Sequence, residues 1–402
     1  GIQFLKDMQT GSVTDHLSVD PHVEGSIEWD GRTMWFIPIT NLIPGKTYRV
    51  TLSAGVESQN QQRLSRDYVW TFQVRKPDIV FISPVGSLRE LWKISTDGGQ
   101  PLQLTNTGGK ILDFGVSRVG DQIAYSLETS EKGADIWVIA RNGQNAKMIV
   151  ECTKARCSEP AWSPDGQYIA YVREDSVGTG VGTFGPPHVW TVKIATKETG
   201  PVYQDAQIYG ADPSWAPDGA RLASYDQSRS SIRILNLETA QSVLLQSDMG
   251  SPGSWSTDGK SMLFTNTNSQ GSQAYVSVFK VNMENGDVEQ ILGEEEQNAV
   301  DFGFPAWSPD QQWVMIGLRI VGGSPNRQIW KIHLDGGDAM EITKDQKYSI
   351  GAYSWSPDGT MVVFQRFPTG QTNATPDILI WNQSTGDFRL LAENAALPAW
   401  WP

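Results

Sequence analysis

The sequence lacks the features that mark a membrane-spanning, metal-binding or common hydrolytic protein. None of its apolar runs approaches the ~18 consecutive residues that a membrane helix needs. It contains no Gly-x-Ser-x-Gly elbow, no HExxH pair and no phosphate-binding loop. Histidine is scarce and scattered, which argues against a histidine metal cluster. The four histidines are His16, His22, His188 and His333.

Cysteine is equally scarce, because only Cys152 and Cys157 occur, in the polar segment ECTKARCSEP. A zinc site would need two further soft ligands, and the segment offers none. A local disulfide and a pair of free thiols both remain open. We favour the disulfide, which suits an oxidising compartment.

Positive charge is in short supply. The chain has 32 Lys+Arg against 45 Asp+Glu, and residues 1–76 contain 8 of each, so the remaining 24 against 37 carry the whole net charge of -13. Such a surface repels phosphate backbones, and we therefore predict no nucleic-acid partner. Solubility alone is the plainer interpretation of this charge.

What the sequence has in abundance is an internal repeat built on tryptophan and a tight turn. The chain contains five copies of a similar segment, of which two are EPAWSPDGQYIAYV and AYSWSPDGTMVVFQ. A degenerate copy, FGVSRVGDQIAYS, has Val116 at the tryptophan position, and the chain ends on half a copy, LPAWWP, with Trp400. These positions recur every 40–53 residues. The tryptophans of the five full copies are Trp162, Trp215, Trp255, Trp307 and Trp355.

Each copy predicts four short strands. The strand with the tryptophan is followed by Ser-Pro-Asp-Gly, a combination that favours a tight turn, and by a second strand such as YIAYV. Four strands at this period are typical of a β-propeller blade. DIVFISP, ELWKIS and LQLT form a first blade that lacks its inner strand, and LPAWWP would supply it. The sequence thus predicts seven blades in a ring closed by the C-terminal strand.

The segments PAWSPDGQYIAY, IWKIHLDGGDAMEIT and LWKISTDGGQPLQLT resemble the TolB-type, or WD-like, propeller repeat. The resemblance covers about residues 78–402, and the departures are Val116, Thr257 in place of the turn proline, and Gln311 in place of the turn glycine. It implies the fold and no particular function. Because TolB itself is expected to have six blades and a different N-terminal domain, the resemblance implies a relative by repeat type.

The first 76 residues resemble the bacterial Ig-like domains of surface proteins, in EGSIEWDGRTMWFIP, LIPGKTYRVTLSAGV and YVWTFQV. Members usually have one strand before the segment matching IQFLKDM, so we expect this domain to be truncated at its N-terminus. Such domains mostly act as spacers in secreted or surface chains. The predicted architecture is all-β, with a small Ig-like β-sandwich at 1–76 and a seven-bladed β-propeller at 77–402.

One face of the propeller is the better candidate for binding. The Ser-Pro-Asp-Gly hairpins share one face, whereas long variable loops such as REDSVGTGVGTFGPPH emerge on the other, around the channel mouth. Acids there are able to bind a cation such as Ca²⁺ or a basic group, but solvated acids at the rim of the channel are the interpretation that we favour. The candidate ligand-binding residues are Asp113, Glu159, Asp212, Asp301, Phe304, Tyr353 and His188.

Two functions remain open. The first is a monomeric, non-catalytic binding or scaffold module that is extracytoplasmic, whether periplasmic, secreted or at the cell surface. Its partner would be a protein, a peptide or a glycan, with membrane attachment only through a segment outside this sequence. The second is a carbohydrate-active enzyme, lyase or glycosidase-like, with its site in the channel. We favour the binding module, because acids occur there without convergent histidines, and we predict no catalytic residue, metal ligand or cofactor.

Overall fold

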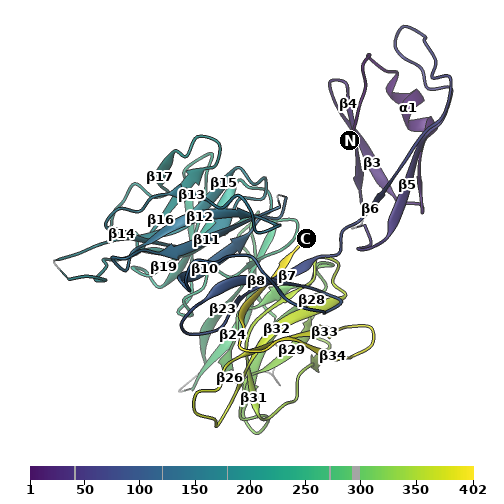
Figure 1. The fold of residues 1–402 in the computed structure, drawn as a ribbon. Coiled ribbons are helices and arrows are strands. Elements are labelled where there is room, and N and C mark those ends of the chain that lie inside the picture. Colours follow the sequence, from purple (N-terminus) through teal and green to yellow (C-terminus); the bar gives the residue numbers. More distant parts are fainter. Residues whose placement is uncertain (40–41, 120, 179, 271–272, 292–298) are drawn as a thin grey trace. The chain divides into compact units, whose positions relative to one another are not determined.

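The computed structural model describes residues 1–402 except 40–41, 120, 179, 271–272 and 292–298. The chain divides into two compact units, residues 1–77 and residues 78–401. The described part is almost entirely β-structure, with one short helix, α1 (Thr10–His16) (Figure 1). No helix among the described residues is long and apolar enough to cross a membrane.

The first unit consists of two small antiparallel sheets, in agreement with the Ig-like prediction. One sheet has the order β1-β4-β3 and the other β2-β5-β6. Val13, Met34, Leu52 and Val56 form its buried core between them. The strands are β1 (Ile2–Gln3), β2 (Leu17–Asp20), β3 (Gly25–Asp30), β4 (Thr33–Pro38), β5 (Thr47–Leu52) and β6 (Tyr68–Gln73).

The second unit is built from seven blades, numbered here along the chain, whose strands pair antiparallel from the inner to the outer edge. Blade 1 contains β35 (Ala396–Trp401), β7 (Asp78–Ser83), β8 (Glu90–Ser95) and β9 (Leu102–Gln103). Blade 2 contains β10 (Ile111–Val116), β11 (Gln122–Glu128), β12 (Ala134–Ala140) and β13 (Lys147–Val150). Blade 3 contains β14 (Ala155–Trp162), β15 (Tyr168–Asp175), β16 (His188–Lys193) and β17 (Thr199–Pro201). Blade 4 contains β18 (Gly210–Trp215), β19 (Arg221–Asp226), β20 (Ser231–Asn236) and β21 (Ser242–Gln246).

Blades 5 to 7 follow the same plan, although two strands share the inner position in blade 6. Blade 5 contains β22 (Ser254–Trp255), β23 (Ser261–Gln270), β24 (Gln273–Asn282) and β25 (Val288–Gln290). Blade 6 contains β26 (Ala299–Phe302), β27 (Ala306–Trp307), β28 (Trp313–Ile320), β29 (Gln328–His333) and β30 (Ala339–Glu341). Blade 7 contains β31 (Tyr348–Trp355), β32 (Met361–Pro368), β33 (Asp377–Asn382) and β34 (Phe388–Ala392).

The C-terminal strand closes the ring, as predicted. β35 pairs antiparallel with β7, with Trp400 opposite Ile79, and Figure 1 shows this yellow strand beside the dark blue β7. Successive side chains of a strand point to opposite faces. Trp400 accordingly packs in the cluster that joins blades 1 and 7, and Trp401 in the cluster that joins blades 1 and 2. The adjacent tryptophans at the end of the chain therefore fill the two interfaces of one blade.

A buried apolar cluster lies between each pair of neighbouring blades. Among these seven clusters the smallest lies between blades 3 and 4, where Ala170, Val189 and Leu222 are the only buried members. The blades are held mainly by this apolar burial, as expected for a radial array of sheets. The interface between blades 3 and 4 is thus the least filled of the ring.

The repeated tryptophans also link the blades by hydrogen bonds. Each indole N–H donates to the backbone carbonyl that precedes the tryptophan position of the preceding blade. Trp355 is an exception, because its buried Nε1 has no partner in the described structure. The five bonds join Trp162 to Gly115, Trp215 to Ala161, Trp255 to Ser214, Trp307 to Ser254 and Trp400 to Ser354, at 2.9–3.3 Å.

The Ser-Pro-Asp-Gly turns are closed by their own side chains. Ser163 Oγ donates to Asp165 Oδ1 at 2.6 Å and accepts the Tyr168 N–H at 2.9 Å. Gly166 has a φ of +70°, the left-handed conformation for which glycine is favoured. The same serine–aspartate bond recurs in Ser256–Asp258, Ser308–Asp310 and Ser356–Asp358. The turn residues thus have structural roles in this fold.

Candidate functional site

Backbone bulges in the inner strands position the predicted acids. The pairing register shifts across Asp113 in β10, across Glu159 in β14 and across Asp212 in β18. Glu159 and Asp212 have backbone φ values of +54° and +56°, which residues other than glycine rarely adopt. Bulges of this kind re-aim a side chain and are common beside functional sites. All three acids lie three residues before the tryptophan position of their blade.

The three acids form a continuous relay across blades 2, 3 and 4. Asp113 Oδ2 accepts the backbone N–H of Glu159 at 3.0 Å, and Glu159 Oε2 accepts the backbone N–H of Asp212 at 2.6 Å. Ser126 Oγ donates to the other oxygen of Asp113. The carboxylates of Asp113 and Glu159 therefore each satisfy the bulged amide of the next blade. We call Asp113, Glu159 and Asp212 the acidic relay.

The relay is electrostatically strained. The pKa of Glu159 is raised to about 7, first of all by burial; the Asp212 N–H opposes this rise, and the neighbouring carboxylates add to it. Burial also raises the pKa values of Asp113 and Asp212. The side chains of Glu159 and Asp212 nevertheless remain accessible to solvent. Arg156 and Arg89 oppose the rise in the pKa of Asp113, whereas no cation among the described residues does so for Glu159 or Asp212.

The predicted residues of blades 6 and 7 form a separate group. Asp301 makes an ion pair of 2.5 Å with Arg327. Tyr353 Oη donates to the carbonyl of Phe304 at 2.6 Å and accepts the Gly317 N–H at 2.7 Å. Asp301 is thereby neutralised and Tyr353 has a positioning role, whereas the Phe304 ring is 57% exposed and remains available for contact.

His188 lies outside both groups. Its Nδ1 is 3.1 Å from the carbonyl oxygen of Ile208, and its ring makes an edge contact with Tyr209, with centroids 5.8 Å apart. Within the described ranges, no three histidine, cysteine, aspartate or glutamate side chains are grouped so that they could hold a metal ion. The acids of the relay meet the backbone instead of converging on one point.

Cys152 and Cys157 are joined by a disulfide, and both residues are buried. Cys157 belongs to β14, two residues before Glu159. The Cys152 N–H donates to Asp135 Oδ1 at 2.7 Å, which ties the same segment to the start of β12. The disulfide therefore holds the strand that carries the central acid of the relay.

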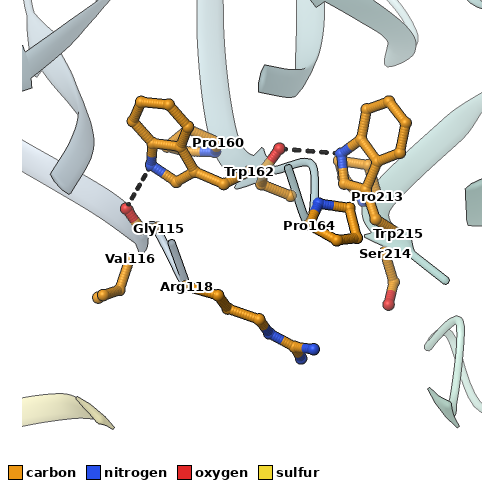
Figure 2. A pocket seen from close by; sticks show the side chains of 10 residues that line it. Gly115, Val116, Arg118, Pro160, Trp162, Pro164, Pro213, Ser214 and Trp215 are labelled. Atoms are coloured by element: carbon orange, nitrogen blue, oxygen red, sulfur yellow. Dashed lines mark hydrogen bonds between the residues drawn. The ribbon is translucent and has the colours of Figure 1, made fainter. Parts of the chain in front are cut away.

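The tryptophan end of the same inner strands contains a pocket that the sequence argument did not predict. Figure 2 shows this pocket, of about 250 Å³, with Arg118 extending below Pro164. A second pocket of about 650 Å³ shares Pro164 and Trp215 with it. The only signal in the sequence was the degenerate repeat, in which Val116 and Arg118 replace the usual tryptophan and proline. The first pocket is lined by Gly115, Val116, Arg118, Pro160, Ala161, Trp162, Pro164, Pro213, Ser214 and Trp215.

The fold and its repeats define a seven-bladed β-propeller that follows a small Ig-like domain. Residues 121–301 match the family model of the TolB beta propeller domain, and residues 1–74 match that of a bacterial Ig-like domain. The chain is therefore a TolB-like propeller protein with an N-terminal bacterial Ig-like domain, which confirms the resemblance read from the repeats.

Individual relatives support the same assignment. The chain is 27% identical over 228 residues to an uncharacterized protein of Agrobacterium fabrum, covering 56% of this chain and 70% of that protein. It is 41% identical over 64 residues to the Tol-Pal system protein TolB of Alcanivorax borkumensis, covering 16% of this chain and 13% of that protein. An oligogalacturonate lyase from Vibrio parahaemolyticus has a TM-score of 0.55 at 12% identity, covering 79% of this chain and 86% of that one. Likeness at that identity shows the fold alone.

Proposed function

We propose that this protein is a non-catalytic, extracytoplasmic binding module whose acidic relay holds a basic segment of a partner protein or peptide. The observation that supports the proposal is the run of hydrogen bonds from Asp113 through Glu159 to Asp212, at 3.0 and 2.6 Å. It links three neighbouring acids, none of which makes an ion pair among the described residues. A lysine or arginine side chain supplies the missing charge together with several N–H donors.

The raised pKa values predict how the affinity for a basic peptide changes with pH. A bound cation favours the ionised form of a carboxyl group and so lowers its pKa. Because the pKa of Glu159 lies at about 7 without a ligand, binding a cation at pH 6 releases a proton. The affinity for a basic peptide therefore rises as the pH increases from 6 to 8. Salt weakens the binding, since the Debye length falls from about 8 Å at 0.15 M to about 3 Å at 1 M.

The disulfide supports the proposed location. A disulfide between Cys152 and Cys157 persists in oxidising compartments, which supports a periplasmic, secreted or surface location. Asp301 adds little charge to the site, because Arg327 is paired with it.

The test is a titration with a fluorescent lysine- and arginine-rich peptide, measured by anisotropy at pH 8. We expect the double variant Glu159→Gln and Asp212→Asn to bind on the order of tenfold more weakly, a loss of about 1.4 kcal/mol. The control is Glu198→Gln with Glu238→Gln, which removes the same charge from exposed outer hairpins of blades 3 and 4. Equal weakening in both double variants would show that net charge, and not the relay, holds the peptide.

A further inference from the structure

The pocket at the tryptophan end includes two positions at which one repeat departs from the others. In blade 2, Val116 stands where the full repeats have tryptophan, so a large ring is missing there. Two residues later Arg118 stands where blade 3 has Pro164 and blade 4 has Pro217. Compared with the full repeats, blade 2 therefore has a smaller side chain at the tryptophan position. It also has a guanidinium in place of the turn proline. The pocket that includes both residues is lined otherwise by blades 3 and 4.

Arg118 has no anionic partner in the described part of the protein. No hydrogen bond or ion pair of its guanidinium occurs there; the residue is exposed to solvent, and partial desolvation of the guanidinium lowers its pKa. Arginine keeps its charge in proteins regardless, so a positive group with five N–H donors faces the recess. In a chain with a net charge of -13, most arginine side chains have a carboxylate within reach. Arg118 is thus a charge-assisted donor that a ligand can use.

The rings and prolines beside Arg118 are held in place, although most of the surface that the pocket exposes is polar. The indole N–H groups of Trp162 and Trp215 are already bonded to the carbonyls of Gly115 and Ala161, so the rings offer the pocket only their apolar surfaces (Figure 2). Pro160, Pro164 and Pro213 also line the pocket beside these rings. One guanidinium beside two indoles and three prolines matches one negative group on an apolar body.

We propose that this pocket binds a small organic carboxylate, with its anionic group on Arg118 and its apolar body between Trp162, Pro164 and Trp215. A planar carboxylate fits the fork of a guanidinium through two parallel hydrogen bonds. A phosphate would demand more donors than the single cation of this pocket supplies. The adjoining pocket of about 650 Å³, which shares Pro164 and Trp215, gives room for a longer body.

The experiment is a ligand-detected NMR titration of the whole protein with phenylacetate and with phenylacetamide, which has the same ring without the charge. We expect phenylacetate to bind at least about tenfold more tightly than phenylacetamide, and acetate or inorganic phosphate to compete weakly. Arg118→Gln should weaken phenylacetate on the order of tenfold, and Arg118→Lys should fall between, because lysine lacks the planar fork. Arg229→Gln, an exposed arginine of blade 4, should change nothing.

Three results would overturn the proposal: no binding of phenylacetate up to about 10 mM, equal binding of phenylacetate and phenylacetamide, or unchanged binding in a folded Arg118→Gln variant. Circular dichroism checks the fold of each variant. The titration of the basic peptide with Arg118→Gln separates the two sites. The peptide should bind as it does to the parent, because none of the relay acids lines the pocket, although Pro160 and Pro213, which do, directly follow Glu159 and Asp212.

Discussion

The two ends of the inner strands β10, β14 and β18 use interblade hydrogen bonds in opposite ways. At the tryptophan end, an indole N–H donates backward to the carbonyl of the preceding blade, and this bond recurs at five interfaces. At the acid end, a carboxylate accepts the amide of the following blade, and only blades 2 to 4 contribute to it. The two ends are three residues apart, or about 10 Å of strand.

The comparison of these two sets of hydrogen bonds indicates which contacts the ring requires. Four of the seven blades have no acid at the position of the relay, yet they pack into the same ring. An interaction repeated around the ring belongs to the fold, whereas one confined to adjacent blades is free to serve binding. The residues at the equivalent position of the other blades are Leu397, Pro252, Phe304 and Ala352.

The sharpest test compares both ends of one strand, β35. Trp400→Ala removes a buried ring that closes blade 1 onto blade 7 and donates to the Ser354 carbonyl at 3.0 Å. We expect it to lower the stability by about 3–5 kcal/mol, the usual cost of a buried tryptophan. Leu397→Ala changes the acid-end position of the same strand, where the side chain is 45% exposed, and should cost far less. Thermal unfolding of both variants measures the contrast, and equal losses would refute it.

The second test concerns the disulfide beside the acid end. Reduction, or replacement of Cys152 and Cys157 by serine, should destabilise the protein by about 2 kcal/mol, since the closed loop is short. The midpoint of thermal unfolding with and without reductant measures this loss. Peptide binding at a temperature where the reduced protein is still folded should weaken only slightly, because the relay bonds do not include the cysteines. A reduced protein as stable as the oxidised one would mean that β14 is held by its neighbours alone.

Much of the fold was predictable because the repeat is long and its chemistry is local. Serine and aspartate close four of these turns within five residues, so their spacing alone marks a hairpin. The closure by LPAWWP was predictable because half a repeat needs its other half. Asp113, Glu159 and Asp212 each lie three residues before the tryptophan position of their repeat. In the structure, hydrogen bonds from carboxylate to backbone amide link these three residues.

The rest depended on contacts that no local pattern records. Arg327 reaches Asp301 from another strand of the blade, so the neutralisation of that acid is invisible in the sequence. The left-handed backbone at Glu159 arises from a bulge that only the pairing with β15 reveals. Arg118 was visible as a departure from the repeat, but a departure alone does not distinguish a defect from a pocket.

The smallest effect, and the most specific to the acid end, is the dependence of stability on pH. The pKa of Glu159 is about 7 in the folded protein and 4.5 for an ordinary glutamate, so the folded state binds the proton more tightly. The contribution of this group is therefore greatest below pH 4.5, and it is lost as the pH rises through 7. Glu159→Gln keeps an oxygen that can accept the Asp212 N–H but cannot ionise. It should match the parent at pH 5 and exceed its stability at pH 8.

The gain at pH 8 should be about 1 kcal/mol or less, because water reaches the side chain and screens its charge. Thermal unfolding at pH 5 and pH 8 measures it, and the variant should show the smaller difference between the two pH values. Glu131→Gln, at an exposed position of blade 2, controls for the loss of one negative charge. If Glu131→Gln flattens the pH dependence as much as Glu159→Gln does, the effect comes from net charge. A flattening confined to Glu159→Gln would instead tie the strain to the relay, where a cationic ligand would relieve it.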